Sequence, residues 1–541
     1  MQNELTYLLS SFKDNPERLF QGYCFDKENF VFGQEGADKY FEETGREIAL
    51  GEDGCYVTAK RVDNGYEIGS DYSGYKKILY FSDEKTGSWA VSNSLTKIVE
   101  HLAENSIRVT PRIQSIMAMH IGISVFQQPV TFDTIANEIK ILPLNSILKI
   151  GAKKLEIRKI HNLDFLETDY DNVLRNFVAM WSSRIATLLS CKDFFIQQGL
   201  TGGLDSRSVF SLSNIANKTQ KVNADYRLIS SLTRGDDIDI KIAGKITNHY
   251  GYELNDKSPP TIYNPKKLNA QEKYLIWKDT SLGLYHPIYF PIFESDYRKV
   301  SIGGHGGENH RIFYAKNPKI YDYDSFIASL SKSFKDTQLK NKFASDLNNT
   351  LSTMQEMDMH GSAIDPLILH YKHFRNRFHS GLFPQYRVVF SPLSSRYLTN
   401  ISTGENSKKL ENSQVLYDLI NLTDGLLEIP FDNLKKFPTQ KNLEQLTKIT
   451  GNVPIKVGRV FSSNNLFKES VSLHTKKSPF IYLKEDFDKA CDTELVKKLW
   501  GKDFINKASN SLDKAVKEGK FGHATDGINV STIIATGLFE L

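Results

Sequence analysis

A glycine-containing stretch near the middle of the chain has the residue types of a phosphate-binding loop: Leu200-Thr201-Gly202-Gly203-Leu204-Asp205-Ser206-Arg207. Adjacent glycines let a backbone approach a ligand closely, and a helix that begins here would direct unpaired N–H groups at that ligand. Thr201 and Ser206 add hydroxyl donors. Asp205 would repel phosphate unless a divalent cation lay between them, so we interpret it as a Mg²⁺ ligand. The alternative is a plain turn in which the glycines only make the bend.

The residues around this loop predict alternating strands and helices. Phe194 to Ile196 form a short aromatic and β-branched run, and apolar residues after the loop recur at helical spacing through Ala216. A second strand is predicted at 226–230, followed by a helix that ends near Tyr250, and a third strand is predicted at 300–302. Repeated strand–helix units of this kind indicate a parallel sheet with ligands at the carboxyl ends of its strands.

A second glycine-rich segment follows the third predicted strand: Gly303-Gly304-His305-Gly306-Gly307, with Glu308 and Asn309 next. Four glycines in five positions after a strand indicate a backbone that wraps closely around another group. The segment therefore belongs beside the first loop as a candidate binding element.

The run from Thr201 to Arg207 resembles the Ser-Gly-Gly-x-Asp-Ser pyrophosphate loop (PP-loop) of N-type ATP pyrophosphatases, and specifically the form found in asparagine synthetase-like proteins. It is not a Walker loop, because Gly-Lys-Ser/Thr is absent. The resemblance implies that ATP is cleaved between its α and β phosphates, which gives an acyl-adenylate and pyrophosphate.

The same resemblance implies a set of site residues. Glu308 stands where the family has an aspartate that supplies a second carboxylate for magnesium, with an exposed loop acid as the alternative. Asn309 replaces the family's next glutamate, unlike true asparagine synthetases. The implied ATP-binding residues are Leu200, Thr201, Gly202, Gly203, Asp205, Ser206, Leu232, Gly303 and Gly304, and the implied Mg²⁺ ligands are Asp205 and Glu308.

The resemblance also implies a lysine from the C-terminal region that reaches the adenylate, where a cation would stabilise developing negative charge. Lys435, Lys436, Lys441 and Lys456 are candidates, and Lys456 is our choice as a catalytic residue together with Glu308. Three acids near the start of the helix after the second strand either approach the nucleotide or complement the helix dipole: Asp236, Asp237 and Asp239.

The N-terminal part reads as a mixed α+β layer domain. Strands are predicted at 55–58, 77–81, 89–91 and 146–150, with a helix at 95–102. Their order resembles the Ntn-type glutamine amidotransferase domain of the same family, including Ser70-Asp71-Tyr72-Ser73-Gly74 before a strand.

That domain lacks the catalytic residue of an active glutaminase. The active enzymes use a cysteine that becomes the first residue once the initiator Met is removed, so that its own α-amino group can serve as base; this chain has Gln2 at that position. Cys24 and Cys55 are internal, so buried thiols are the expectation for them. We therefore expect a degenerate domain that does not split glutamine.

These patterns predict two domains in a chain of 541 residues. Residues 1–165 form the degenerate amidotransferase-like domain. Residues 166–541 form an α/β parallel-sheet PP-loop domain that opens with an amphipathic helix over 170–189. Its C-terminal part from Ser472 is expected to be helical, to cap the core and to be a candidate homodimer surface.

The composition gives no support for a nucleic-acid-binding, membrane-bound, disulfide-linked or zinc-binding protein. Lys and Arg exceed Asp and Glu by only four, so the charge gives no reason to expect nucleic acid or an anionic membrane as a partner. The four cysteines lie far apart, which argues against disulfides and zinc. No signal peptide or membrane span is visible, and the expected location is the cytoplasm.

The function expected from the sequence is that of an AMP-forming amide ligase. It would use ATP and Mg²⁺ to adenylate a carboxylate of a small molecule, peptide or saccharide. Ammonia, an amine or ammonia from a partner glutaminase would then displace AMP. The resemblance allows amidation, lactam closure and macrolactam formation. The alternatives are asparagine synthetase proper and a nucleotide-binding pseudoenzyme or scaffold.

Overall fold

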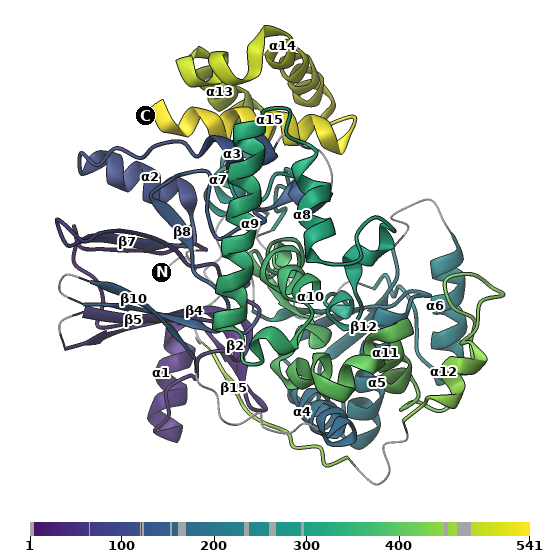
Figure 1. Ribbon diagram of the computed structural model, residues 1–541. Coiled ribbons are helices and arrows are strands. Elements are labelled where there is room, and N and C mark those ends of the chain that lie inside the picture. The colour runs from purple at the N-terminus through teal and green to yellow at the C-terminus, as the bar shows by residue number, and fades with distance from the viewer. Residues whose placement is uncertain are drawn as a thin grey trace.

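The computed structural model describes residues 5–63, 65–119, 121, 124–151, 154–160, 169–231, 237–258, 267–293, 297–447, 453–462 and 478–540. Within them, the chain combines an antiparallel sheet, a larger sheet that is antiparallel except for its last pair of strands, one parallel sheet and many helices (Figure 1).

The N-terminal region contains the first two of these sheets in adjacent layers (Figure 1). One has the order β1 (Leu8–Ser10), β7 (Ser88–Ser92), β6 (Leu79–Asp83), β8 (Ile139–Ile141). The other has the order β10 (Leu155–Lys159), β9 (Ser146–Ile150), β5 (Gly65–Ser70), β4 (Asp53–Val62), β2 (Arg18–Asp26), β3 (Asn29–Phe32), β15 (Val460–Phe461).

A shared apolar core joins these sheets. Val57, Ile68 and Leu148 from the larger sheet are buried with Leu9 and Val91 from the smaller one. Helices α1 (Gly33–Thr44) and α2 (Leu95–Glu104) lie on opposite outer sides, and α3 (Ile113–Met119) follows (Figure 1). The predicted layered α+β arrangement is present, and the four predicted strands and the helix are all found.

The second region is built on a parallel sheet with the order β12 (Asp225–Ile229), β11 (Phe195–Gly199), β13 (Lys299–Ile302), β14 (Val388–Phe390). Before β11 runs α4 (Tyr170–Ser190), and after it runs α5 (Leu204–Thr219). Each predicted strand and helix of this part is present within a few residues of its expected bounds. The fourth strand, β14, was not predicted because its three residues carry no periodicity.

Helices make up most of the rest of the second region. They are α6 (Asp237–Tyr250), α7 (Ala270–Ser281), α8 (Tyr323–Ser331), α9 (Thr337–Met357), α10 (Pro366–His370), a π-helix (Tyr371–Ser380), α11 (Gln414–Ile420) and α12 (Gln440–Glu444). The C-terminal helices α13 (Pro479–Asp492), α14 (Glu494–Glu518) and α15 (Ala524–Gly537) pack on α7 and α3 (Figure 1). The expected helical cap is therefore present.

The chain does not divide cleanly at residue 165. Strand β15, far along the second region, pairs in parallel with β3 through Val460 and Phe461. Buried polar contacts also join the regions: Arg184 on α4 pairs with Asp53 at the start of β4, and Asp53 accepts the backbone N–H of Arg396 at 2.9 Å. The two regions thus share an interface that holds the parallel sheet against the other two.

Candidate functional site

The strand order of the parallel sheet places the two glycine-containing loops side by side. The chain leaves β11 toward β12 on one side, and later leaves β13 toward β14 on the other. Ligands of open α/β sheets bind at such a switch point, outside the carboxyl ends of the strands. Here those ends carry residues 200–203 and 303–307, so the sheet itself selects these two loops as the candidate site.

The first loop passes directly into helix α5, as predicted. Gly203 is the N-cap, and no side chain caps the helix, so the first-turn N–H groups are available for an anion. Ser206 Oγ accepts the N–H of Thr201 at 3.0 Å and lies 3.0 Å from its hydroxyl. Asp239, at the start of α6, accepts the N–H of Gly202 at 3.0 Å.

Leu200 can contribute only its backbone to the candidate site. Its side chain is fully buried in a small core with Phe210 and Leu228, and its N–H donates to Ile229 at 2.8 Å. Leu232, which we expected beside the nucleotide, lies outside the described residues. The contact of Asp239 with the loop links the second strand–helix unit to the site, and a carboxylate at that position was among the sequence candidates.

The glycine-rich loop after β13 lies against the first loop. A Cβ on Gly304 would come within 2.8 Å of the Ser206 nitrogen, and a Cβ on Gly307 would overlap the carboxylate of Asp205. Gly306 adopts φ 91°, and a Cβ there would overlap Ser394. The glycines are therefore required because this backbone is packed between α5 and the segment that follows β14.

Asp205 and Glu308 meet through a residue that the sequence did not single out. Arg311 Nη2 lies 3.0 Å from Asp205 Oδ2 and 3.2 Å from Glu308 Oε1. Asp205 Oδ1 is buried and has no hydrogen-bond partner among the described residues. The only sequence signal for Arg311 was its position three residues after Glu308, where one turn of chain can bring the two side chains together.

The two carboxylates have opposite pKa shifts. Burial raises the pKa of Asp205 to about 6, against the lowering effect of Arg311. Burial would also raise the pKa of Glu308, but Arg311, the backbone and Lys316 outweigh it, so the pKa of Glu308 is lowered. Glu308 is thus the more readily ionised of the two carboxylates, and Asp205 the more readily protonated.

These residues fit a Mg²⁺ ion bound together with phosphates. Two carboxylates with hard oxygen atoms converge, one of them has an unpartnered oxygen, and phosphate oxygens would complete the coordination. The described residues offer no cluster of three or more His, Cys, Asp or Glu side chains for a metal. A purely protein-made metal site is therefore absent from the described part of the chain.

A segment from the C-terminal region covers the first loop. Arg207, fully buried, donates from Nη1 to the carbonyls of Leu426 at 3.2 Å and Ile429 at 2.7 Å, and its guanidinium lies 3.8 Å from the centre of the Phe431 ring. The backbone N–H of Asp432 then donates to the carbonyl of Gly202 at 3.2 Å. The arginine of the loop thus has a structural role, which is to hold residues 426–432 over the site.

The structure separates the candidate lysines. Lys435 and Lys436 follow Asp432 on the covering segment, and Lys436 forms an ion pair with Asp432. Lys456 instead pairs with Glu28, in the turn between β2 and β3, and its N–H donates to Ser183 on α4 at 2.9 Å. None of the described contacts brings Lys456 to the glycine-containing loops.

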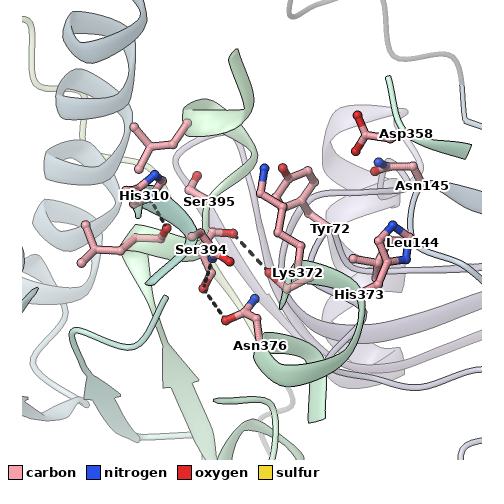
Figure 2. A pocket seen from close by; sticks show the side chains of 14 residues that line it. Tyr72, Leu144, Asn145, His310, Asp358, Lys372, His373, Asn376, Ser394 and Ser395 are labelled. Carbon is pink, nitrogen blue, oxygen red and sulfur yellow. Dashed lines mark hydrogen bonds between the residues drawn. The ribbon is translucent and has the colours of Figure 1, made fainter. Parts of the chain in front are cut away.

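A small polar cavity lies behind the second loop, between the two regions of the chain (Figure 2). Its volume of 20 Å³ is room for a water-sized molecule and not for a substrate acid. Ser394 connects it to the site: its Oγ accepts from Tyr75 Oη at 3.0 Å and from Asn309 Nδ2 at 3.4 Å. The Tyr72–Tyr75 turn of the first region therefore supports the back of the glycine-rich loop.

The cysteines of the first region are inert in this setting. Cys24 and Cys55 are buried, as expected, and neither forms a disulfide. Burial raises the pKa of Cys24 well above its ordinary value and that of Cys55 to about 12. A thiolate nucleophile is disfavoured at both positions.

Comparison with known proteins adds nothing to these observations, because neither the models of known protein families nor the curated proteins include a match to the chain. In its described parts, the chain has no helix that combines the length and the apolar character needed to cross a membrane.

Proposed function

We propose that this protein is an ATP-dependent, AMP-forming amide ligase of the asparagine synthetase-like kind. The observation that carries the proposal is the convergence of Asp205 and Glu308, from two glycine-containing loops, on one cation at the switch point of the parallel sheet. A helix N-terminus that no side chain of the described residues caps, beside two carboxylates, suits a metal–polyphosphate group better than a neutral ligand.

The proposed reaction has two steps. A carboxylate oxygen of the acceptor attacks the α-phosphorus of ATP, and the bond to the β-phosphate oxygen breaks, which releases pyrophosphate. A nitrogen nucleophile then attacks the acyl carbon, loses a proton and displaces AMP. Bound Mg²⁺ would neutralise phosphate charge as pyrophosphate leaves.

The residues of the chain supply positioning and electrostatics. Asp205 and Glu308 would hold the metal, and the N–H groups at the start of α5 and the Ser206 hydroxyl would bind pyrophosphate. Lys436, which forms an ion pair with Asp432 of the segment held by Arg207, is proposed in place of Lys456 to stabilise charge on the adenylate. With both first-region thiols buried, ammonia or an amine from outside is the proposed donor.

Pyrophosphate release from Mg-ATP tests the proposal. The full chain is assayed against a panel of carboxylates with ammonia, glutamine and simple amines. Asp205→Ala should lower release at least about a hundredfold, because loss of even an outer partner of a metal ligand costs about 10–100-fold. Asp237→Ala, which removes an exposed acid at the start of α6, should leave the rate unchanged. Loss of pyrophosphate release in both variants alike would refute the assignment.

A second function has one specific observation in its favour. Because Arg311 pairs with both carboxylates, the site is also compatible with a nucleotide-binding pseudoenzyme in which the arginine permanently replaces the metal. ATP binding without pyrophosphate release in the presence of any acid would identify that case.

A further inference from the structure

Arg311 is held almost entirely by the two candidate metal ligands. It arises from the same turn as Glu308 but reaches across to Asp205 on the other loop. Its Nε is buried without a hydrogen-bond partner, and within the described residues its ion pairs are with these two acids only. No carbonyl or further carboxylate in that part of the structure fixes the guanidinium in place.

A guanidinium and a divalent cation compete for the same oxygen atoms here. A Mg²⁺ ion binds carboxylate oxygens at about 2.0–2.1 Å, whereas Arg311 Nη2 already lies 3.0 Å from Asp205 and 3.2 Å from Glu308. Both cations cannot lie between the two carboxylates at once. The arginine balances only one of the two negative charges, and Asp205 Oδ1 has no hydrogen-bond partner among the residues that the structure describes.

We propose that Arg311 is an exchangeable resident cation that determines how the site acquires its metal. In the nucleotide-free protein it pairs with Asp205 and Glu308 and keeps free divalent ions out. A metal that arrives with ATP brings phosphate oxygens as additional ligands, and this ternary binding displaces the guanidinium. The inference rests on the proposed function, since it assumes that the two acids are metal ligands.

Binding of Mn²⁺ to the nucleotide-free full chain tests this inference without any enzyme assay. Free Mn²⁺ is followed by electron paramagnetic resonance for the wild type, Arg311→Gln and Arg311→Lys. R311Q should bind Mn²⁺ about tenfold more tightly or better, because an adjacent opposite charge changes the proton affinity of a carboxylate by about tenfold to a thousandfold. R311K should be intermediate, because an ammonium cannot bridge both acids as the planar guanidinium does.

Two further variants make the result specific. Lys316→Gln removes a nearby exposed cation that influences both acids from a distance, and it should change Mn²⁺ affinity much less than R311Q. The double variant R311Q with Asp205→Asn should lose the gain. Thermal unfolding checks that each variant is folded. If R311Q does not fold, the Mn²⁺ affinity of R311K relative to that of the wild type tests the inference instead.

The possible failures can be told apart. Unchanged or weaker Mn²⁺ binding in R311Q would overturn the inference, because Arg311 would then position the acids and not compete for them. If R311Q shows no gain in Mn²⁺ affinity but the wild type releases pyrophosphate, the ligase proposal is kept and the cation-exchange inference is rejected. If R311Q gains Mn²⁺ affinity but no acid elicits pyrophosphate, cation exchange stands and the ligase proposal falls.

Discussion

Replacing Asp205 with asparagine should stabilise the protein at neutral pH while it removes a ligand of the proposed metal site. Asp205 is mostly buried, and burial raises its pKa from 3.8 to about 6. The folded protein therefore binds a proton at this carboxyl more tightly than the unfolded chain does. Asparagine resembles the protonated form in shape and carries no charge to desolvate.

The size and sign of the effect follow from the pKa. At 1.36 kcal/mol per pKa unit, a rise from 3.8 to about 6 corresponds to about 3 kcal/mol. Because the folded pKa is raised, this contribution is fully present below pH 3.8 and is lost as pH rises through about 6. The stability of Asp205→Asn minus that of the wild type should therefore increase by about 2–3 kcal/mol from pH 4 to pH 7.

Thermal unfolding midpoints measured between pH 4 and pH 7.5 without divalent cations give the comparison. A multidomain chain does not unfold in a single two-state step, so the quantity compared is the difference between midpoints at each pH. For this size, a change of 2–3 kcal/mol corresponds to a few degrees. Mg²⁺ with ATP should stabilise the wild type and leave the variant unaffected, because binding to the folded state alone raises the midpoint.

Glu308→Gln is the matched control, and its effect on stability should have the opposite sign to that of Asp205→Asn. The pKa of Glu308 is lowered, so its ionised form contributes stability above its unfolded pKa and loses it as pH falls. E308Q should be less stable than the wild type at pH 7, and this difference should shrink in acid. If both variants change in parallel with pH, the assigned asymmetry between the two carboxylates is wrong.

Three further predictions concern residues around the site. Arg207→Met should lower stability by about 2–4 kcal/mol, because buried carbonyls lose charged donors, and it should weaken ATP binding measured by calorimetry, since the covering segment is released. Lys436→Ala should slow pyrophosphate release about tenfold or more, whereas Lys456→Ala should leave it unchanged. The reverse result would support Lys456, the lysine chosen from the sequence. Native protein treated with a glutamine-site affinity label or a thiol reagent should show no modification of Cys24 or Cys55 by mass spectrometry, because their thiols are buried and protonated.

Local periodicity was sufficient to predict the elements that begin the second region. The helix expected over 170–189 is α4, and the strand, loop and helix around Gly202 are β11 and α5. These elements have long apolar patterns or turn residues with a defined backbone requirement. The sequence also indicated layered strands in the first region, although it did not show that β2 and β3 belong to the larger sheet.

Long-range contacts account for most of what the sequence could not show. Strand β15 has two residues, and its pairing with β3 depends on a neighbour more than 400 positions earlier in the chain. The contacts of Arg207 with residues 426–431 and of Lys456 with Glu28 are of the same kind. A lysine in a basic tail gives no local signal of which acid it will meet.

The glycines of the second loop show why strand order matters more here than either loop alone. A phosphate cradle explains small residues that face a ligand, yet Gly304 and Gly307 face Asp205 and Ser206 of the other loop. Their missing side chains let the backbone after β13 lie against the start of α5. That approach brings Glu308 and Arg311 within reach of Asp205, which lies in the first turn of α5, after the neighbouring strand β11. The two glycine-containing segments are therefore packed together at one place, where Arg311 pairs with an acid from each.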